Sequence, residues 1–271
     1  MVEPQTHGTE NFSCVDGQGR QAFICLHGIH KRFGEKVILD DFSLNVFPGE
    51  TLVILGGSGT GKSVSLRHIT GLIRPDRGEV LVDGQRVHTL RESQLVEVRR
   101  KVGYLFQGGA LFDSMNVYDN IAFPLREARW SEQEVAARIP EVLALVDLDE
   151  DVAGQMPDAL SGGMQKRVAL ARAIAVEPRA ILYDEPTTGL DPVTANTIND
   201  LIRSMQQRLG VTSVVVTHDI QSAFRVGDRI AFLYQGRIRF LGTVRQARET
   251  DDPVLAAFIA GRSLEEGRSD A

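Results

Sequence analysis

Short runs of apolar residues, many of them β-branched, recur along the chain with helical stretches between them. The later runs alternate with helices, and fully apolar runs such as 214–216 suit central strands of a parallel sheet that is buried on both faces. The earlier runs are closely spaced and are broken by glycine- and proline-containing turns, which favours antiparallel hairpins. The predicted strands cover residues 22–27, 44–47, 51–55, 80–82, 102–106, 180–183, 213–217 and 230–234.

The segment from residue 107 to residue 178 follows a different pattern. Its apolar residues recur at helical spacing, as in Val135, Ile139, Val142, Leu143 and Val146, and it contains no convincing strand. We therefore predict a helical subdomain inserted into an α/β fold. With 271 residues and 42% hydrophobic side chains, the chain has enough apolar material for a full core.

Charge and composition exclude several functions. The formal net charge of −6, without a basic block, makes nucleic acid a poor default partner. No apolar run approaches the roughly 20 residues that a membrane-spanning helix needs. The first twenty residues have neither a basic start nor an apolar core, so they do not resemble a signal peptide, and we expect a cytosolic protein. Cys14 and Cys25 are expected to be reduced bystanders.

A glycine-rich segment joins the strand at 51–55 to a predicted helix beginning near Lys62, and it matches the pattern G-x-x-x-x-G-K-[ST]. Glycines let backbone N–H groups approach an anion, and the helix adds the positive end of its dipole. The pattern predicts a nucleoside triphosphate site, with Lys62 reaching the β- and γ-phosphates and Ser63 a Mg²⁺ ion. An ordinary strand-to-helix turn is the alternative. The segment consists of Gly56, Gly57, Ser58, Gly59, Thr60, Gly61, Lys62 and Ser63.

The apolar strand predicted at 180–183 ends in two carboxylates, Asp184 and Glu185. Asp184, at the end of the strand, is placed to hold Mg²⁺ directly or through water. The Glu185 side chain leaves the strand in another direction, so it suits a base that activates water better than a second metal ligand. The alternative, an Asp-Glu-Pro turn that caps the next helix, is less favoured beside a phosphate loop.

A Ser-Gly-Gly turn, made by Ser161, Gly162 and Gly163, precedes a long helix predicted at 165–177 and forms a second helix N-terminus able to bind an anion. With this third motif the sequence, from about residue 23 to residue 242, resembles the ATP-binding subunits of ABC transporters. The resemblance implies an α/β P-loop NTPase with a RecA-like parallel-sheet core, an antiparallel β-subdomain and an inserted helical subdomain. It also implies that two copies sandwich two ATP molecules with Mg²⁺, each Ser-Gly-Gly turn covering the γ-phosphate bound by the other copy.

Further positions match that family one by one. Phe33 matches an aromatic that stacks on adenine, with a buried core phenylalanine as the alternative. Gln107 matches a glutamine that touches the metal and the attacking water, and Asp191 belongs to a loop that crosses the dimer interface. His218 matches a histidine that contacts the γ-phosphate. A lone histidine is more often structural, but of the 6 histidines only His218 falls at the family position.

Val64 departs from the wider superfamily, where a Thr or Ser hydroxyl commonly contacts the α-phosphate; here only its backbone N–H can serve. The same valine, together with residues 105–127, resembles the ATPases of Mce-type phospholipid transporters, and so does the segment 252–261. That resemblance implies an inner-membrane permease, a Mce-domain lipid-binding protein and a small cytosolic accessory subunit as partners. Three apolar residues become candidates for a groove that receives a permease helix, unless they only pack the helical subdomain: Leu111, Phe112 and Met115.

We therefore expect a flexible tail at 1–20, an ABC ATP-binding domain at 21–245 with its helical subdomain at about 107–178, and a C-terminal helix and tail at 246–271. The expected function is ATP hydrolysis that powers phospholipid transport, at the cytoplasmic face of the inner membrane. The alternatives are transport of another solute such as an amino acid, an ABC ATPase that acts on ribosomes or DNA, and a nucleotide-gated partner with little turnover. The last two fit less well, because the chain has no second cassette and because Glu185 and His218 are both present.

Overall fold

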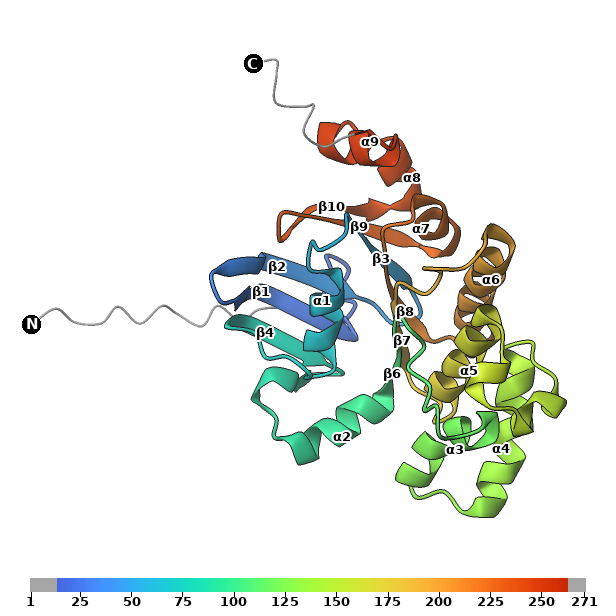
Figure 1. Cartoon of the computed structure of the whole chain (residues 1–271). Helices are drawn as coiled ribbons and strands as arrows, with labels where there is room; N and C mark the ends of the chain where they lie inside the picture. Colours follow the sequence, from blue (N-terminus) through green and yellow to red (C-terminus); the bar gives the residue numbers. More distant parts are fainter. Residues whose placement is uncertain (1–13, 263–271) are drawn as a thin grey trace, which may run out of the picture.

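The computed structural model describes residues 14–262, which form two sheets flanked by helices (Figure 1). Within these residues the larger sheet is 6-stranded, in the order β10-β9-β3-β8-β7-β6, and the smaller is 4-stranded, in the order β2-β1-β4-β5. The strands are β1 (Ile24–Phe33), β2 (Lys36–Val46), β3 (Thr51–Leu55), β4 (Arg77–Val82), β5 (Gln85–Arg86), β6 (Val102–Leu105), β7 (Ala180–Asp184), β8 (Thr212–Thr217), β9 (Arg229–Tyr234) and β10 (Arg237–Thr243).

The larger sheet is the parallel core that the apolar runs predict. Strands β6, β7, β8, β3 and β9 are parallel to one another, and only β10, at the edge beside β9, is antiparallel. Every residue of β3, β7 and β8 is buried. In β3 the side chains alternate between two cores, since Val53 and Leu55 belong to one apolar cluster and Leu52 and Ile54 to the other. Both faces of the sheet are therefore covered.

Helices cover the two faces unequally. Helix α1 and the antiparallel sheet pack on one face, whereas the inserted helical region and α6 and α7 belong to the cluster on the other. Figure 1 shows α3, α4 and α5 together at the lower right and α8 and α9 at the top. The helices are α1 (Lys62–Ile69), α2 (Glu92–Lys101), α3 (Val117–Glu127), α4 (Glu132–Leu145), α5 (Gly162–Ile174), α6 (Pro192–Leu209), α7 (Ile220–Val226), α8 (Val244–Arg248) and α9 (Pro253–Ile259), with short 3₁₀ turns at Val87–Thr89, Glu150–Gly154 and Pro157–Ala159.

The helical subdomain agrees with its sequence pattern. No strand occurs between residues 107 and 178, all of which are described. The five apolar residues that gave the pattern are all fully or almost fully buried. Helix α4 begins at a capping box, in which Ser131 Oγ accepts from the Glu134 N–H and the Glu134 carboxylate accepts from the Ser131 N–H.

The antiparallel sheet differs from the prediction in extent. Strands β1 and β2 are longer than the predicted runs because they continue through polar residues that are partly exposed at one end of the sheet. Strand β10 was not predicted, since only alternate residues are half-buried and the rest are exposed. An edge strand of this kind is defined by its pairing with β9 rather than by apolar content.

The expectation of two reduced thiols is wrong, because Cys14 and Cys25 form a disulfide. Cys25 lies on β1 and packs with Ala22 and Phe47, while the chain before it turns back through a bridge between Val15 and Gln21. Of the tail predicted at 1–20, residues 1–13 lie outside the described residues, as does the end of the chain from 263. Nowhere in residues 14–262 does a helix have the length and apolarity that crossing a membrane requires.

Candidate functional site

The glycine-rich loop joins β3 to α1 at the carboxyl end of the parallel sheet. Gly61, the N-cap of α1, has φ 105°, a conformation that favours glycine. Gly56 is tightly enclosed, since a Cβ there would lie 2.6 Å from the Leu233 carbonyl oxygen. No side chain caps α1. Its first N–H groups are therefore available to an anion.

Lys62 is buried, and its ammonium group lies inside the loop. Nζ donates to the carbonyl oxygens of Gly56 at 3.0 Å and Gly57 at 2.9 Å, and it lies 3.2 Å from Glu185 Oε1. Thr60 Oγ1 also donates to the Gly57 carbonyl, at 2.9 Å. The loop thus carries a fixed positive charge that faces a carboxylate of the next motif.

Asp184 ends β7, and each of its carboxylate oxygens accepts one hydrogen bond. Ser63 Oγ donates to Oδ1 at 2.6 Å and the Tyr104 hydroxyl donates to Oδ2 at 3.0 Å. Burial, followed by the charge of Asp184, raises the pKa of Tyr104, so the phenol remains a donor. The loop serine and the strand-end aspartate, 121 positions apart, are therefore in direct contact.

Glu185 has a left-handed backbone conformation with φ 49°, and its N–H donates to the Val216 carbonyl at 2.9 Å. Non-glycine residues held in this region are strained, and such strain gathers at functional sites. Oε2 accepts from Thr188 Oγ1 at 3.3 Å and lies 2.9 Å from His218 Nδ1. Adjacent in sequence, Asp184 and Glu185 thus face different partners.

A cleft of about 320 Å³ brings together most of the predicted site residues. Phe33 lies at its edge and is 49% exposed, so the alternative of a buried core phenylalanine is wrong. The cleft is lined by Phe33, Ile38, Ser58, Gly59, Gly61, Lys62, Ser63, Val64, Gln107, Glu185 and His218.

The Ser-Gly-Gly turn lies elsewhere. Ser161 caps α5 by accepting from the Met164 N–H at 3.3 Å, and Asp191 caps α6 by accepting from the N–H groups of Val193 and Thr194. A Cβ at Gly163 would lie 2.5 Å from Thr194 Cγ2, so the beginnings of α5 and α6 are packed together. The cleft lining includes neither Asp191 nor any residue of the Ser-Gly-Gly turn.

The sequence interpretation missed three polar side chains near the cleft, the buried Lys166 and the partly buried Tyr104 and Arg172. Lys166 Nζ donates to the Gln107 carbonyl, and Arg172 donates to the carbonyls of Gly109 at 2.9 Å and Ala110 at 2.8 Å. Burial lowers the pKa of both Lys166 and Arg172. The available signal was the position of Lys166 and Arg172 on the largely buried helix α5, because cations there need backbone carbonyls as partners.

An apolar groove of about 570 Å³ lies behind Tyr104, between β6, α3 and α5. Of the three residues predicted for such a groove, Phe112 lines it, Leu111 instead packs against the core of the helical region, and Met115 is not among the lining residues. Phe106, Phe112 and Phe123 provide its exposed aromatic surface, at 38%, 40% and 39% exposure.

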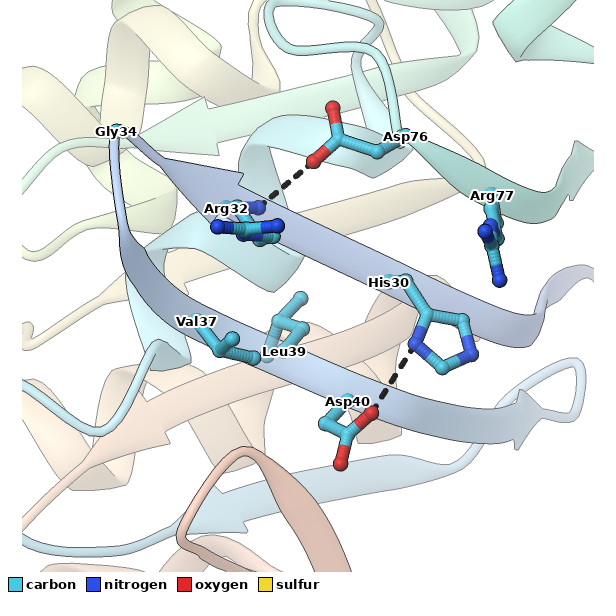
Figure 2. A pocket seen from close by; sticks show the side chains of 8 residues that line it. All are labelled: His30, Arg32, Gly34, Val37, Leu39, Asp40, Asp76 and Arg77. Carbon is cyan, nitrogen blue, oxygen red and sulfur yellow. Dashed lines mark hydrogen bonds and ion pairs between the residues drawn. The ribbon is translucent and has the colours of Figure 1, made fainter.

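A larger hollow of about 630 Å³ lies on the antiparallel sheet (Figure 2). Figure 2 shows its two carboxylates already engaged: Asp40 lies 3.1 Å from His30 Nδ1, and Asp76 accepts from the Arg32 N–H at 2.7 Å. None of the predicted site residues, all of which are described, lines this hollow. Size alone therefore does not identify the functional cleft.

The site has three features at the ends of parallel strands: a buried lysine, a hydroxyl–carboxylate pair and a glutamate–histidine pair. Together they define a P-loop nucleotide-hydrolysing site. The model of the ABC transporter family matches residues 39–188, more than half of the chain, and the chain belongs to this family as an ATPase. The match does not extend to Phe33, Asp191 or His218.

Individual relatives are similar to this chain over most of its length. The intermembrane phospholipid transport system ATP-binding protein MlaF of Escherichia coli K12 is 40% identical over 84% of this chain and 85% of its own length. The probable ribonucleotide transport ATP-binding protein mkl of Mycobacterium tuberculosis H37Rv is 42% identical over 88% of this chain and 67% of its own. Among solved structures, an ATP-binding cassette in a dimeric post-hydrolysis state with ADP and phosphate is 37% identical, with a TM-score of 0.75 over 82% of this chain and 99% of that one.

Proposed function

We propose that the protein is the ATP-hydrolysing subunit of a transporter that moves phospholipid between membranes of the cell envelope. The observation that carries the ATPase part is the cleft in which the loop lysine and serine meet Glu185 and His218. The phospholipid part is supported by the likeness to MlaF and by the apolar groove directly behind the site.

In this proposal the loop N–H groups and Lys62 bind the triphosphate, and Phe33 stacks on the adenine ring. The exposed ring of Phe33 at the cleft edge suits that contact, because a stacking surface has to be open on one face. Val64 contributes its backbone N–H, since its side chain packs against the core.

The chemistry of the site suits Mg²⁺. Ser63 Oγ and Asp184 Oδ1, 2.6 Å apart, are hard oxygen donors of the kind that Mg²⁺ prefers. Ser63, Asp184 and Gln107 are the residues that would hold the ion. When bound, Mg²⁺ would neutralise charge on the β- and γ-phosphates.

Glu185 is the proposed general base. It would accept a proton from the water that attacks the γ-phosphate, while the bond from the γ-phosphorus to the β–γ bridging oxygen breaks. His218 Nδ1 and Thr188 Oγ1 orient the Oε2 atom, and His218 lies in the cleft where it can reach the γ-phosphate. Glu185 also lies beside Lys62. The charge of Lys62 would face the phosphate while the proton passes from the water to Glu185.

We further propose that a second copy completes each site. Because Ser161, Gly162 and Gly163 do not line the cleft of their own chain, they are available to cover the γ-phosphate of a partner, with Asp191 beside them. ATP would favour the closed dimer, since only there are all its contacts made. A permease helix in the apolar groove, at the cytoplasmic face of the inner membrane, would then move with the helical subdomain; a Mce-domain protein and an accessory subunit would complete the assembly.

The substrate test uses the complex isolated from membranes of the source cells. We expect phospholipid to co-purify with it, and its ATPase to drive transfer of fluorescent phospholipid between vesicles, with Glu185→Gln as the matched inactive control. The relatives named for ribonucleotide transport suggest the competing hypothesis, in which the transported substrate is a ribonucleotide. ATPase activity stimulated by ribonucleotides, with no lipid transfer, would replace the phospholipid assignment and leave the ATPase assignment intact.

A further inference from the structure

One side chain contacts both the proposed metal site and the apolar groove. The Tyr104 hydroxyl donates to Asp184 Oδ2 at 3.0 Å, while the Tyr104 ring lines the groove. The ring also stacks on Phe106, with centroids 4.1 Å apart and planes 22° apart. Phe106 immediately precedes Gln107, so this stack lies between the groove and the cleft.

The Asp184 carboxylate has little freedom. It is 4% exposed, and its two oxygens are bound from different elements, Oδ1 by the loop and Oδ2 by β6. Strands β6 and β7 are paired in parallel with Tyr104 opposite Leu182, two positions before Asp184. A carboxylate that is fixed through one oxygen presents the other in a constant orientation.

We propose that Tyr104 is a positioning residue for Asp184, and that it makes the geometry of this carboxylate dependent on what fills the groove. An occupant that presses on the Phe106–Tyr104 stack moves the phenol, and the phenol moves Asp184 relative to Ser63. The inference rests on the proposed role of Asp184 as a Mg²⁺ ligand. It adds a defined link from the groove to that ligand, through a single ring.

The test measures binding of a fluorescent non-hydrolysable ATP analogue to the full-length chain as Mg²⁺ is titrated. Tyr104→Phe keeps the ring and its stack but removes the donor to Asp184. We expect the Mg²⁺ concentration for half-maximal response to rise roughly tenfold, as is usual when a group supporting a metal ligand is lost. Nucleotide binding in EDTA should stay within about twofold of wild type, because the loop contacts remain.

Tyr183→Phe is the matched control. It removes a buried hydroxyl from the neighbouring strand, at a position whose side chain packs in the other core cluster, and should leave the Mg²⁺ requirement unchanged. Phe106→Ala keeps the Tyr104 hydroxyl but removes the ring stacked on it, and should shift the requirement in the same direction by roughly twofold to threefold. That shift is the signature of the link to the groove.

A wild-type Mg²⁺ requirement in Tyr104→Phe overturns the positioning role, even if the variant melts earlier, since a purely structural hydrogen bond changes stability alone. Should Tyr104→Phe lose binding in EDTA as well, Phe106→Ala decides, and no shift there overturns the inference. Asp184→Asn separates this outcome from failure of the underlying proposal. If Asp184→Asn does not raise the Mg²⁺ requirement, the metal assignment itself is wrong.

Discussion

Two glycine-rich turns begin helices in this protein, and their surroundings are very different. The first, before α1, has Gly61 as its N-cap, no side-chain cap, and a buried lysine that lies 3.2 Å from Glu185. The second, before α5, is capped by its own Ser161, and its Gly163 packs against Thr194 at the beginning of α6. The first turn thus lines a cleft of its own chain, whereas the second turn does not line that cleft. In the proposed dimer, similar local chemistry would supply two halves of one site.

The largest effect is expected from the base in the first half. Glu185→Gln keeps the size of the side chain but removes the proton acceptor, so phosphate release should fall by at least about 100-fold. ATP binding should persist, and the variant should elute as an ATP-dependent dimer in size-exclusion chromatography. Near-normal hydrolysis in this variant would contradict the assignment of Glu185.

The difference between the turns is tested most directly by mixing two inactive variants. Lys62→Ala removes the charge of the first turn, and Ser161→Glu puts a carboxylate at the second, where it would repel the partner's γ-phosphate. Each alone should be nearly inactive, and only Lys62→Ala should weaken ATP binding by the isolated chain.

A mixed dimer of these variants retains one intact composite site. An equimolar mixture should therefore recover up to about one quarter of wild-type ATPase activity, if subunits pair at random in a symmetric dimer. A mixture no more active than its components would indicate that each chain hydrolyses ATP with its own residues alone.

Features remote from both turns should change stability and leave turnover unchanged. Cys14→Ser opens the loop between residues 14 and 25, and a loop of this length is worth at most about 3 kcal/mol. We expect a lower midpoint of thermal unfolding without reductant, an unchanged midpoint relative to wild type with reductant, and wild-type kcat. A change in kcat would mean that the tether acts on the site.

A smaller effect on stability is expected at the ion pairs that Asp83, directly after β4, forms with two basic residues. Asp83 lies 2.8 Å from Lys101 Nζ and 2.7 Å from Arg179 Nη1, and these partners hold the pKa of Asp83 below its usual value. A lowered pKa stabilises the fold above the pKa of the unfolded chain, and this contribution disappears as pH falls through the folded-state pKa. Asp83→Asn should cost about 0.5–1 kcal/mol at pH 7. The difference in thermal midpoint from wild type should narrow below about pH 4; a constant difference would argue against an ionic origin.

Most of the proposed catalytic half-site was visible in the sequence, because its members lie at fixed offsets from elements with strong local patterns. The loop follows a fully buried strand, and Asp184 and Glu185 follow another. The residues that support them were not visible. Tyr104 is 80 positions from Asp184, and their contact depends on the pairing of β6 with β7, which periodicity does not report.

The groove and the disulfide show the same limit. Leu111 has the apolar character expected of a groove residue, yet it packs inward, and the groove is lined by residues from several elements, among them β6, the loop after it, α3 and α5. Cys14 and Cys25 have an uninformative spacing, and a turn closed by Val15 and Gln21 brings them together. Whether an apolar side chain faces a groove, and whether two cysteines meet, depends on residues that are distant in the chain.

The sequence by itself determined the class of chemistry, since a glycine-rich loop with Lys62 and Ser63, and a strand ending in Asp184 and Glu185, act through local backbone geometry and side-chain type. It also determined the buried strands and the helical insertion, since apolar periodicity is a local property. Only the tertiary structure decided which oxygen of Asp184 is bound by which donor, that the two glycine-rich turns do not share a cleft, and where the groove lies. Those features depend on distances between elements, and such distances are fixed by packing.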